Sequence, residues 1–189
     1  MIEQQNEERM SALKIRNLFA LALILLMISC SAEVTKDALK DEIQNLQEEL
    51  HAISLAGADE QQLRQVSKKL QEKITEYIER FPDDEMVPDL LFYRANVEAE
   101  LLQSYEEAID SLQKLLTIFP DHEHSERSLF LIGYTYSEKM EDFESAGHIY
   151  RRFQEMYPDS ELISIVEFQL ENMGKRPEDF DFLRDLPRD

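Results

Sequence analysis

The sequence predicts an all-α protein built from repeated helical hairpins, and three observations support this prediction. Only 4 Gly and 6 Pro occur in 189 residues, too few for the many turns of a β-sandwich. Aromatic–proline pairs recur every 38 residues, at Phe81-Pro82, Phe119-Pro120 and Tyr157-Pro158. The segments before these pairs carry apolar residues at the 3.6-residue period of a helix. A fixed period of this length indicates a helical repeat.

A shift of 38 residues aligns side chains of the same character along a whole unit. The matching pairs are Leu91/Leu129, Phe92/Phe130, Ala95/Gly133, Tyr105/Phe143, Ala108/Ala146 and Phe119/Tyr157. Each unit contains two helices, and the proline ends the second because it lacks an N–H group and disfavours helical geometry in the residue before it. The small residues are expected where the two helices of a hairpin approach most closely.

These residues resemble the tetratricopeptide repeat (TPR), which has a small residue in its first helix and an Ala, an aromatic residue and a terminal Pro in its second. The resemblance covers residues 87–158. It implies a right-handed helical-hairpin solenoid, here of about three helix pairs plus a capping helix. The steps from Ala95 to Ala108 and from Gly133 to Ala146 are one residue longer than the family pattern. This predicts a slightly extended turn between the paired helices.

The rest of the chain is divided around these repeats. We expect a degenerate first helix pair in 37–82, TPR-like repeats in 83–120 and 121–158, a capping helix in 159–173 and a C-terminal tail in 174–189.

A heptad pattern of apolar residues lies in the first of these segments. Its members are Leu39, Ile43, Leu46, Leu50 and Ile53. Two interpretations are open: a coiled coil that oligomerises, or an antiparallel helix pair that forms a degenerate first repeat. The repeat register favours the second, since Leu70 aligns with Ala108 and Phe81 with Phe119.

The N-terminal segment predicts a secretory signal. Residues 18–28 read LFALALILLMI, an apolar run that would span roughly 16 Å as a helix. This is too short to cross a bilayer but suits the apolar region of a signal peptide. Lys14 and Arg16 supply the positive charge before it, and Met10 is the expected initiator.

The end of this run, Met27-Ile-Ser-Cys30, resembles the lipobox of bacterial lipoproteins. The resemblance implies a signal peptide in 1–29, cleavage before Cys30, and acyl chains such as palmitate on the Cys30 sulfur and the new amino terminus. Residues 30–36 would be the lipidated linker. Because Ser31 is not the Asp that often retains lipoproteins in the inner membrane, attachment to the outer membrane is expected. The alternative is a signal cut elsewhere, which would leave a free thiol.

Composition and motifs argue against catalysis and nucleic-acid binding. With 40 acidic and 20 basic residues, the formal charge of −20 repels phosphate backbones. The sequence contains no Gly-rich phosphate loop, nucleophile elbow or zinc-protease helix motif. The cluster His122-Glu-His124 has no Cys or further His nearby to complete a coordination shell. We therefore expect no enzyme, no cofactor and no metal site.

What remains is a surface for a partner protein. The TPR resemblance implies that its concave side is lined by the first helices. The implied positions are Asp89, Phe92, Asn96, Arg127, Phe130 and Tyr134. The aromatic rings would anchor a partner peptide, and Asn96 and Arg127 would bond its backbone or a carboxylate. Alternatively, the two phenylalanines belong to the core and the two polar side chains are merely solvated.

The predicted function is a membrane-anchored periplasmic TPR adaptor that binds protein partners in cell-envelope assembly, with outer-membrane proteins as candidate clients. The layout resembles the TPR lipoprotein of the outer-membrane barrel-assembly machinery and the TPR protein of the Tol–Pal system. The alternative is a carbohydrate- or nutrient-handling outer-membrane lipoprotein on a TPR scaffold. Such proteins carry their ligand site in large insertions, and this sequence has none.

Overall fold

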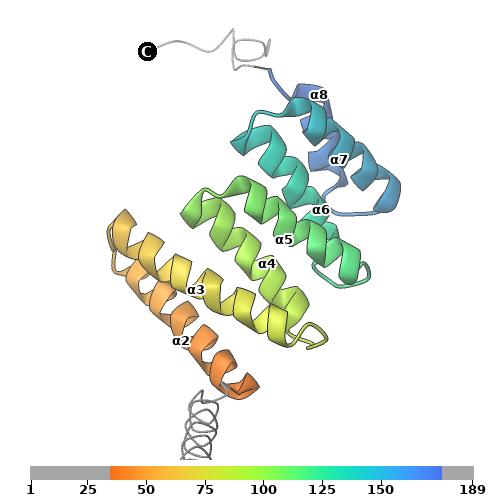
Figure 1. The fold of residues 1–189 in the computed structure, drawn as a ribbon. Coiled ribbons are helices and arrows are strands. Elements are labelled where there is room, and N and C mark those ends of the chain that lie inside the picture. Colours follow the sequence, from red (N-terminus) through yellow and green to blue (C-terminus); the bar gives the residue numbers. More distant parts are fainter. Residues whose placement is uncertain (1–34, 176–189) are drawn as a thin grey trace, which may run out of the picture. The chain divides into compact units, whose positions relative to one another are not determined.

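The computed structural model describes residues 35–175, and every regular element in this range is helical (Figure 1). The helices form three hairpins followed by a single helix. In chain order they are α2 (Lys36–Leu55), α3 (Glu60–Arg80), α4 (Val87–Val97), η1 (Glu98–Leu102), α5 (Tyr105–Ile118), α6 (Ser125–Tyr134), η2 (Thr135–Lys139), α7 (Phe143–Met156) and α8 (Ile163–Asn172). The predicted all-α helical-hairpin fold is confirmed. The expected signal peptide, Cys30 and most of the C-terminal tail lie outside the described residues.

The first hairpin pairs α2 with α3 around a shared apolar cluster. Leu39, Ile43 and Leu50 of α2 are buried together with Leu70 and Ile74 of α3. The heptad residues of α2 thus face the neighbouring helix of the same chain. The repeat register does not extend to the turn, since α3 starts at Glu60, seven residues before the position that corresponds to the start of α5.

The second helices of all three hairpins end in the same way. The backbone N–H groups of Phe81, Phe119 and Tyr157 donate to the carbonyl four residues earlier at 2.8–2.9 Å. Their φ angles are −131°, −127° and −132°. This shared geometry is the structural basis of the aromatic–proline spacing, because the following proline cannot continue the helix.

The extra residue of each repeat lies inside the first helix. Residues 98–102 and 135–139 form π-helical turns, and a π-turn holds one residue more than an α-turn. Each is followed by a residue of positive φ at the same repeat position, Gln103 (56°) and Glu141 (55°). Only Gln103 and Ser104 separate η1 from α5. The predicted extended turn is therefore wrong for this repeat, because the helix absorbs the additional residue.

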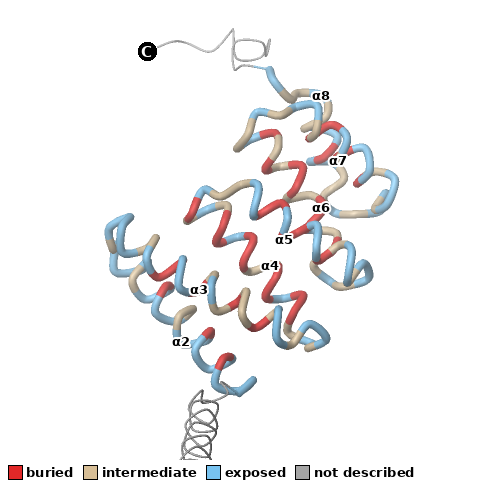
Figure 2. Tube along the Cα trace, viewed as in Figure 1, coloured by how far each residue is buried: buried red, intermediate tan, exposed pale blue. Residues whose placement is uncertain are grey.

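Small residues do mark the close approach of paired helices. A Cβ added to Gly133 would lie 2.6 Å from Cε1 of Tyr150, whose ring is fully buried. One repeat earlier, Ala95 shares a cluster with the smaller Leu112. The burial of Tyr150 raises the pKa of its hydroxyl to about 12. Buried positions recur along α4, α5 and α6 in Figure 2 and mark the sides on which the hairpins stack.

A buried polar network joins the first hairpin to the second. Arg94 and Glu98 form an ion pair at 3.5 Å, with only 9% and 3% of their side chains exposed. Arg94 donates to the hydroxyls of Ser111 (3.0 Å) and Thr75 (3.3 Å). Gln71 donates to Glu98 at 2.8 Å. Each charge therefore has several partners, which offsets the cost of removing it from water.

Candidate functional site

The residues predicted to bind a partner lie on the first helices of the two repeats, α4–η1 and α6–η2, and we call this set the first-helix face. Its residues are Asp89, Phe92, Asn96, Arg127, Phe130 and Tyr134. Two polar contacts join the two sides of this face. Lys139 pairs with Glu100 at 3.2 Å, and His124 approaches Asp89 at 3.3 Å. The hydrogen bond to Glu100 raises the pKa of Lys139.

The aromatic residues of the face are half-buried and differ in their contacts. Phe92 stacks on the ring of His124, with centroids 4.2 Å apart and planes at 17°. Phe130 lies within 6.1 Å of Tyr150 and 6.4 Å of Tyr134. Phe92 and Phe130 also pack against buried core clusters, so both phenylalanines belong partly to the core, whereas Tyr134 lines the cleft.

The two polar residues of the face are exposed. The side-chain amide of Asn96 donates to the carbonyl of Phe92 at 2.7 Å, which orients the amide along α4. Arg127 forms no ion pair with any residue between 35 and 175. A guanidinium without an ion-pair partner can bind a carboxylate through two parallel hydrogen bonds.

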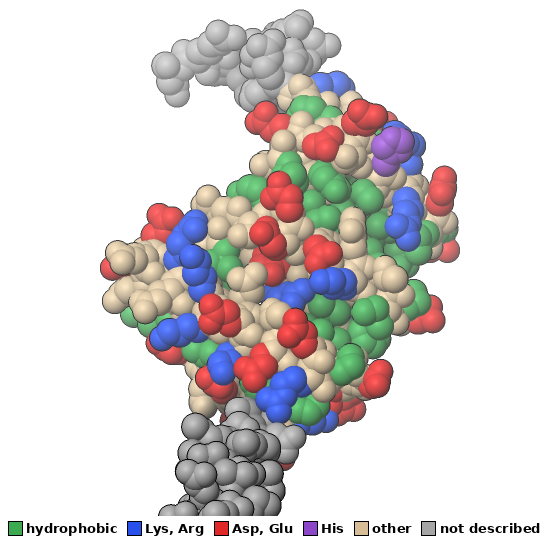
Figure 3. Space-filling view, in the orientation of Figure 1, with side chains coloured by type: hydrophobic (Ala, Val, Ile, Leu, Met, Phe, Trp, Pro, Cys, Tyr) green, Lys and Arg blue, Asp and Glu red, His purple; other side chains and the backbone are tan. Residues whose placement is uncertain are grey.

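Between the two helices runs a shallow cleft rather than a pocket. Asn96, Ala99, Leu131 and Tyr134 are among its lining residues, and its volume is only about 30 Å³. A large side chain would not fit inside, so a bound chain would lie across the face. Figure 3 shows one side of the molecule, on which acidic and basic side chains are interspersed with exposed hydrophobic ones.

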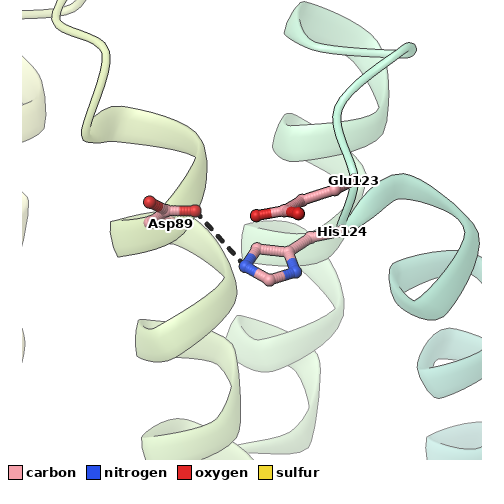
Figure 4. A group of neighbouring side chains, drawn as sticks. All are labelled: Asp89, Glu123 and His124. Atoms are coloured by element: carbon pink, nitrogen blue, oxygen red, sulfur yellow. Dashed lines mark ion pairs between the residues drawn. The ribbon is translucent and has the colours of Figure 1, made fainter.

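One end of the face carries a cluster of possible metal ligands. The nearest ligand atoms of Asp89, Glu123 and His124 all lie within 4.8 Å of one another (Figure 4). His122 is also close, with Nε2 3.7 Å from Oδ1 of Asp89. From the sequence, the two histidines had no further ligand nearby. The stacking of the helices brings Asp89 close to His124. The two residues are 35 positions apart, and nothing in the sequence indicates that they lie close together.

A hollow also lies at the other end of the repeats. It has a volume of about 540 Å³, and Phe143 and Phe168 contribute to its wall. Val166 of α8 is fully buried against α7, as expected for a capping helix. On the outer side of α8, Ile165 and Phe168 are 45% and 57% exposed, which the sequence did not indicate. None of the described helices is both long and apolar enough to cross a membrane.

Comparison with known proteins matches the second and third hairpins to a family. Residues 89–122 and 127–160 each fit the family model described as tetratricopeptide repeat. The comparison with curated proteins gives no match to the chain. Repeats of this kind generally serve as protein-binding scaffolds rather than enzymes. The two helix pairs that build the first-helix face are therefore similar to tetratricopeptide repeats.

Proposed function

We propose that the protein is a lipid-anchored adaptor of the bacterial cell envelope, which binds a partner protein through the first-helix face. The observation that carries the binding part is that Asn96 of α4 and Tyr134 of α6 line one cleft within the two matched repeats. Aromatic and Arg side chains are the residue types that contribute most of the binding energy in protein interfaces.

The contacts of this face also suggest the chemistry of the partner. Arg127 forms no ion pair with any residue between 35 and 175, so an acidic side chain or a C-terminal carboxylate of the partner would pair with it. Tyr134, seven residues further along α6, lines the cleft and offers an aromatic ring to an apolar group. The small cleft suits an extended segment that lies across the two first helices. We therefore infer a peptide-like segment with one apolar and one acidic group.

The anchoring part of the proposal rests on the N-terminal sequence. The apolar run before Cys30 and its lipobox-like end support lipid attachment, and Ser31 favours the outer membrane. Two or three acyl chains would hold the protein stably, whereas one chain would not. The adaptor would then act in the periplasm, for example in the assembly of outer-membrane proteins.

Site-directed crosslinking tests the binding surface. A photo-crosslinking amino acid in place of Tyr134 should capture a partner from membranes, and that partner is then purified for affinity measurement. We expect Arg127→Glu to weaken binding about tenfold or more, because it places a negative charge against the carboxylate. Arg152→Glu, an equal charge change on exposed α7, is the matched control and should change affinity less than twofold. Equal losses in both variants would reject the first-helix face.

Membrane fractionation tests the anchor independently. The Cys30→Ala variant should move from the membrane to the soluble fraction and keep the helical circular dichroism signal of the native protein. If the variant remained in the membrane after washing with high salt, the anchor would not be a lipid on Cys30.

A further inference from the structure

We propose that Asp89, Glu123 and His124 bind one divalent transition-metal ion, with Zn²⁺ the best match. Asp89 lies in the first turn of α4, while Glu123 and His124 belong to the turn that leads into α6. Their side chains point toward one another across this junction (Figure 4). The site goes beyond the proposed partner binding, because it joins one repeat to the next within the protein itself.

The spacing of the donor atoms fits such an ion after small side-chain movements. The three ligand atoms lie within 4.8 Å of one another, and Oδ1 of Asp89 is 3.3 Å from Nε2 of His124. Donor atoms on a tetrahedral zinc ion lie about 3.4 Å apart. Asp89 and Glu123 are exposed and can rotate to close the remaining gap. Three protein ligands would leave a fourth position for water.

The surroundings hold His124 in place. Its ring stacks on Phe92, which fixes the plane of the imidazole. His122 has a different role, because its Nδ1 accepts the backbone N–H of His124 at 3.3 Å. In the neutral ring the proton therefore lies on Nε2. This Nε2 atom is 3.7 Å from Oδ1 of Asp89. This separation is longer than a hydrogen bond, so His122 lies beside the Asp89 carboxylate without bonding to it.

The donor types determine which ions are expected. Imidazole nitrogen favours Zn²⁺, Ni²⁺ and Cu²⁺, whereas Mg²⁺ and Ca²⁺ prefer oxygen ligands alone. A formal charge of −20 also raises the local concentration of cations around the protein. An ion here would connect α4 to the turn before α6, and would fix the two sides of the first-helix face relative to one another.

Calorimetric titration with zinc chloride tests the proposal on the full chain carrying Cys30→Ala, which removes the only thiol. We expect one equivalent to bind and to raise the midpoint of thermal unfolding, because the ion binds the folded state. Asp89→Asn and His124→Ala should each weaken binding about tenfold or more. His148→Ala removes an exposed histidine of α7 and should change affinity less than twofold.

Two further measurements keep the test decisive. Glu123→Gln alters an exposed turn residue, so its loss of affinity cannot come from unfolding, and circular dichroism checks every variant. Excess Mg²⁺ should fail to displace the bound zinc. The proposal is overturned if titration shows no saturable site, if Mg²⁺ competes effectively, or if Glu123→Gln and His148→Ala bind zinc equally well.

Discussion

The two repeats that match the tetratricopeptide model share a backbone but differ in the chemistry of their interior. Both have a π-turn in the first helix and an aromatic C-cap on the second, and the two caps lie 38 residues apart. At three equivalent positions, however, a polar network in the first repeat is replaced by aliphatic or aromatic side chains in the second. These pairs are Arg94/Ile132, Glu98/Tyr136 and Ser111/Ile149.

This difference shows that the period of small, aromatic and proline residues determines the backbone, while the packed interior can vary. Ile132 is buried and needs no particular partner. Arg94 and Glu98 are buried equally well, yet each depends on the other and on hydroxyl or amide neighbours. The first repeat is therefore more sensitive to the loss of a single polar group.

The largest effect is expected from Glu98→Ala. This change leaves the Arg94 guanidinium buried without its carboxylate, and removing one partner of a buried ion pair costs about 3–5 kcal/mol. Urea unfolding followed by circular dichroism measures the free energy of unfolding. The double change Arg94→Met/Glu98→Met makes the site apolar, like its counterpart in the second repeat, and should cost less than Glu98→Ala alone. A larger loss in the double variant would contradict this account of the network.

A smaller effect is expected from Gly133→Ala. This change tests whether the paired helices of the second repeat approach too closely to leave room for a Cβ atom. The added methyl group would overlap the buried ring of Tyr150, and such overpacking costs about 1–3 kcal/mol. Gly147→Ala is the matched control, because its Cβ would meet only the mobile guanidinium end of Arg151. This control should leave stability unchanged or raise it, since Ala favours helices over Gly.

A double variant tests whether the small residue on the first helix compensates for the size of the residue that it faces on the second helix. Gly133→Ala with Tyr150→Leu reproduces the Ala95/Leu112 pair of the first repeat. It should recover part of the stability lost in Gly133→Ala, with thermal unfolding as the measurement. If Gly133→Ala and Gly147→Ala behave alike, close approach at Gly133 is not limiting.

The sequence predicted the features that recur with the period. The aromatic–proline pairs located the ends of the second helices, and the small residue at Gly133 located a close helix contact. These predictions succeed because each feature depends on residues within the same repeat. The residues of the first-helix face were placed through family resemblance, and the structure brings Asn96 and Tyr134 to one cleft.

The features that the sequence did not predict depend on contacts between units. Gln71 and Glu98 are 27 residues apart, and nothing in their local pattern indicates a hydrogen bond. Asp89 and His124 likewise meet only because consecutive hairpins stack. The position of the extra residue could not be inferred either, since a longer turn and a π-turn lengthen the step from Ala95 to Ala108 equally.

The smallest effect is expected at the N-caps of the second helices, where the repeats also differ. Oδ1 of Asp142 accepts the backbone N–H of Ser145 at 3.0 Å, whereas Ser104 at the equivalent position makes no side-chain cap. Asp142→Ala should lower the midpoint of thermal unfolding at pH 7, and Ser104→Ala should not.

The pH dependence of the stabilisation by Asp142 tests whether the negative charge of its carboxylate contributes to it. Hydrogen bonds from Ser145, its hydroxyl first and then its backbone N–H, lower the pKa of the Asp142 carboxyl from its usual 3.8. The folded pKa lies below the unfolded one, so the stabilisation is fully present above pH 3.8 and is lost as the pH falls through the folded pKa. The gap in unfolding midpoint between wild type and Asp142→Ala should therefore narrow below pH 3.8. Asp142→Asn keeps an uncharged cap, and its gap to Asp142→Ala should persist at low pH. A wild-type gap that did not change with pH would show that the hydrogen bond alone, without the charge, stabilises α7.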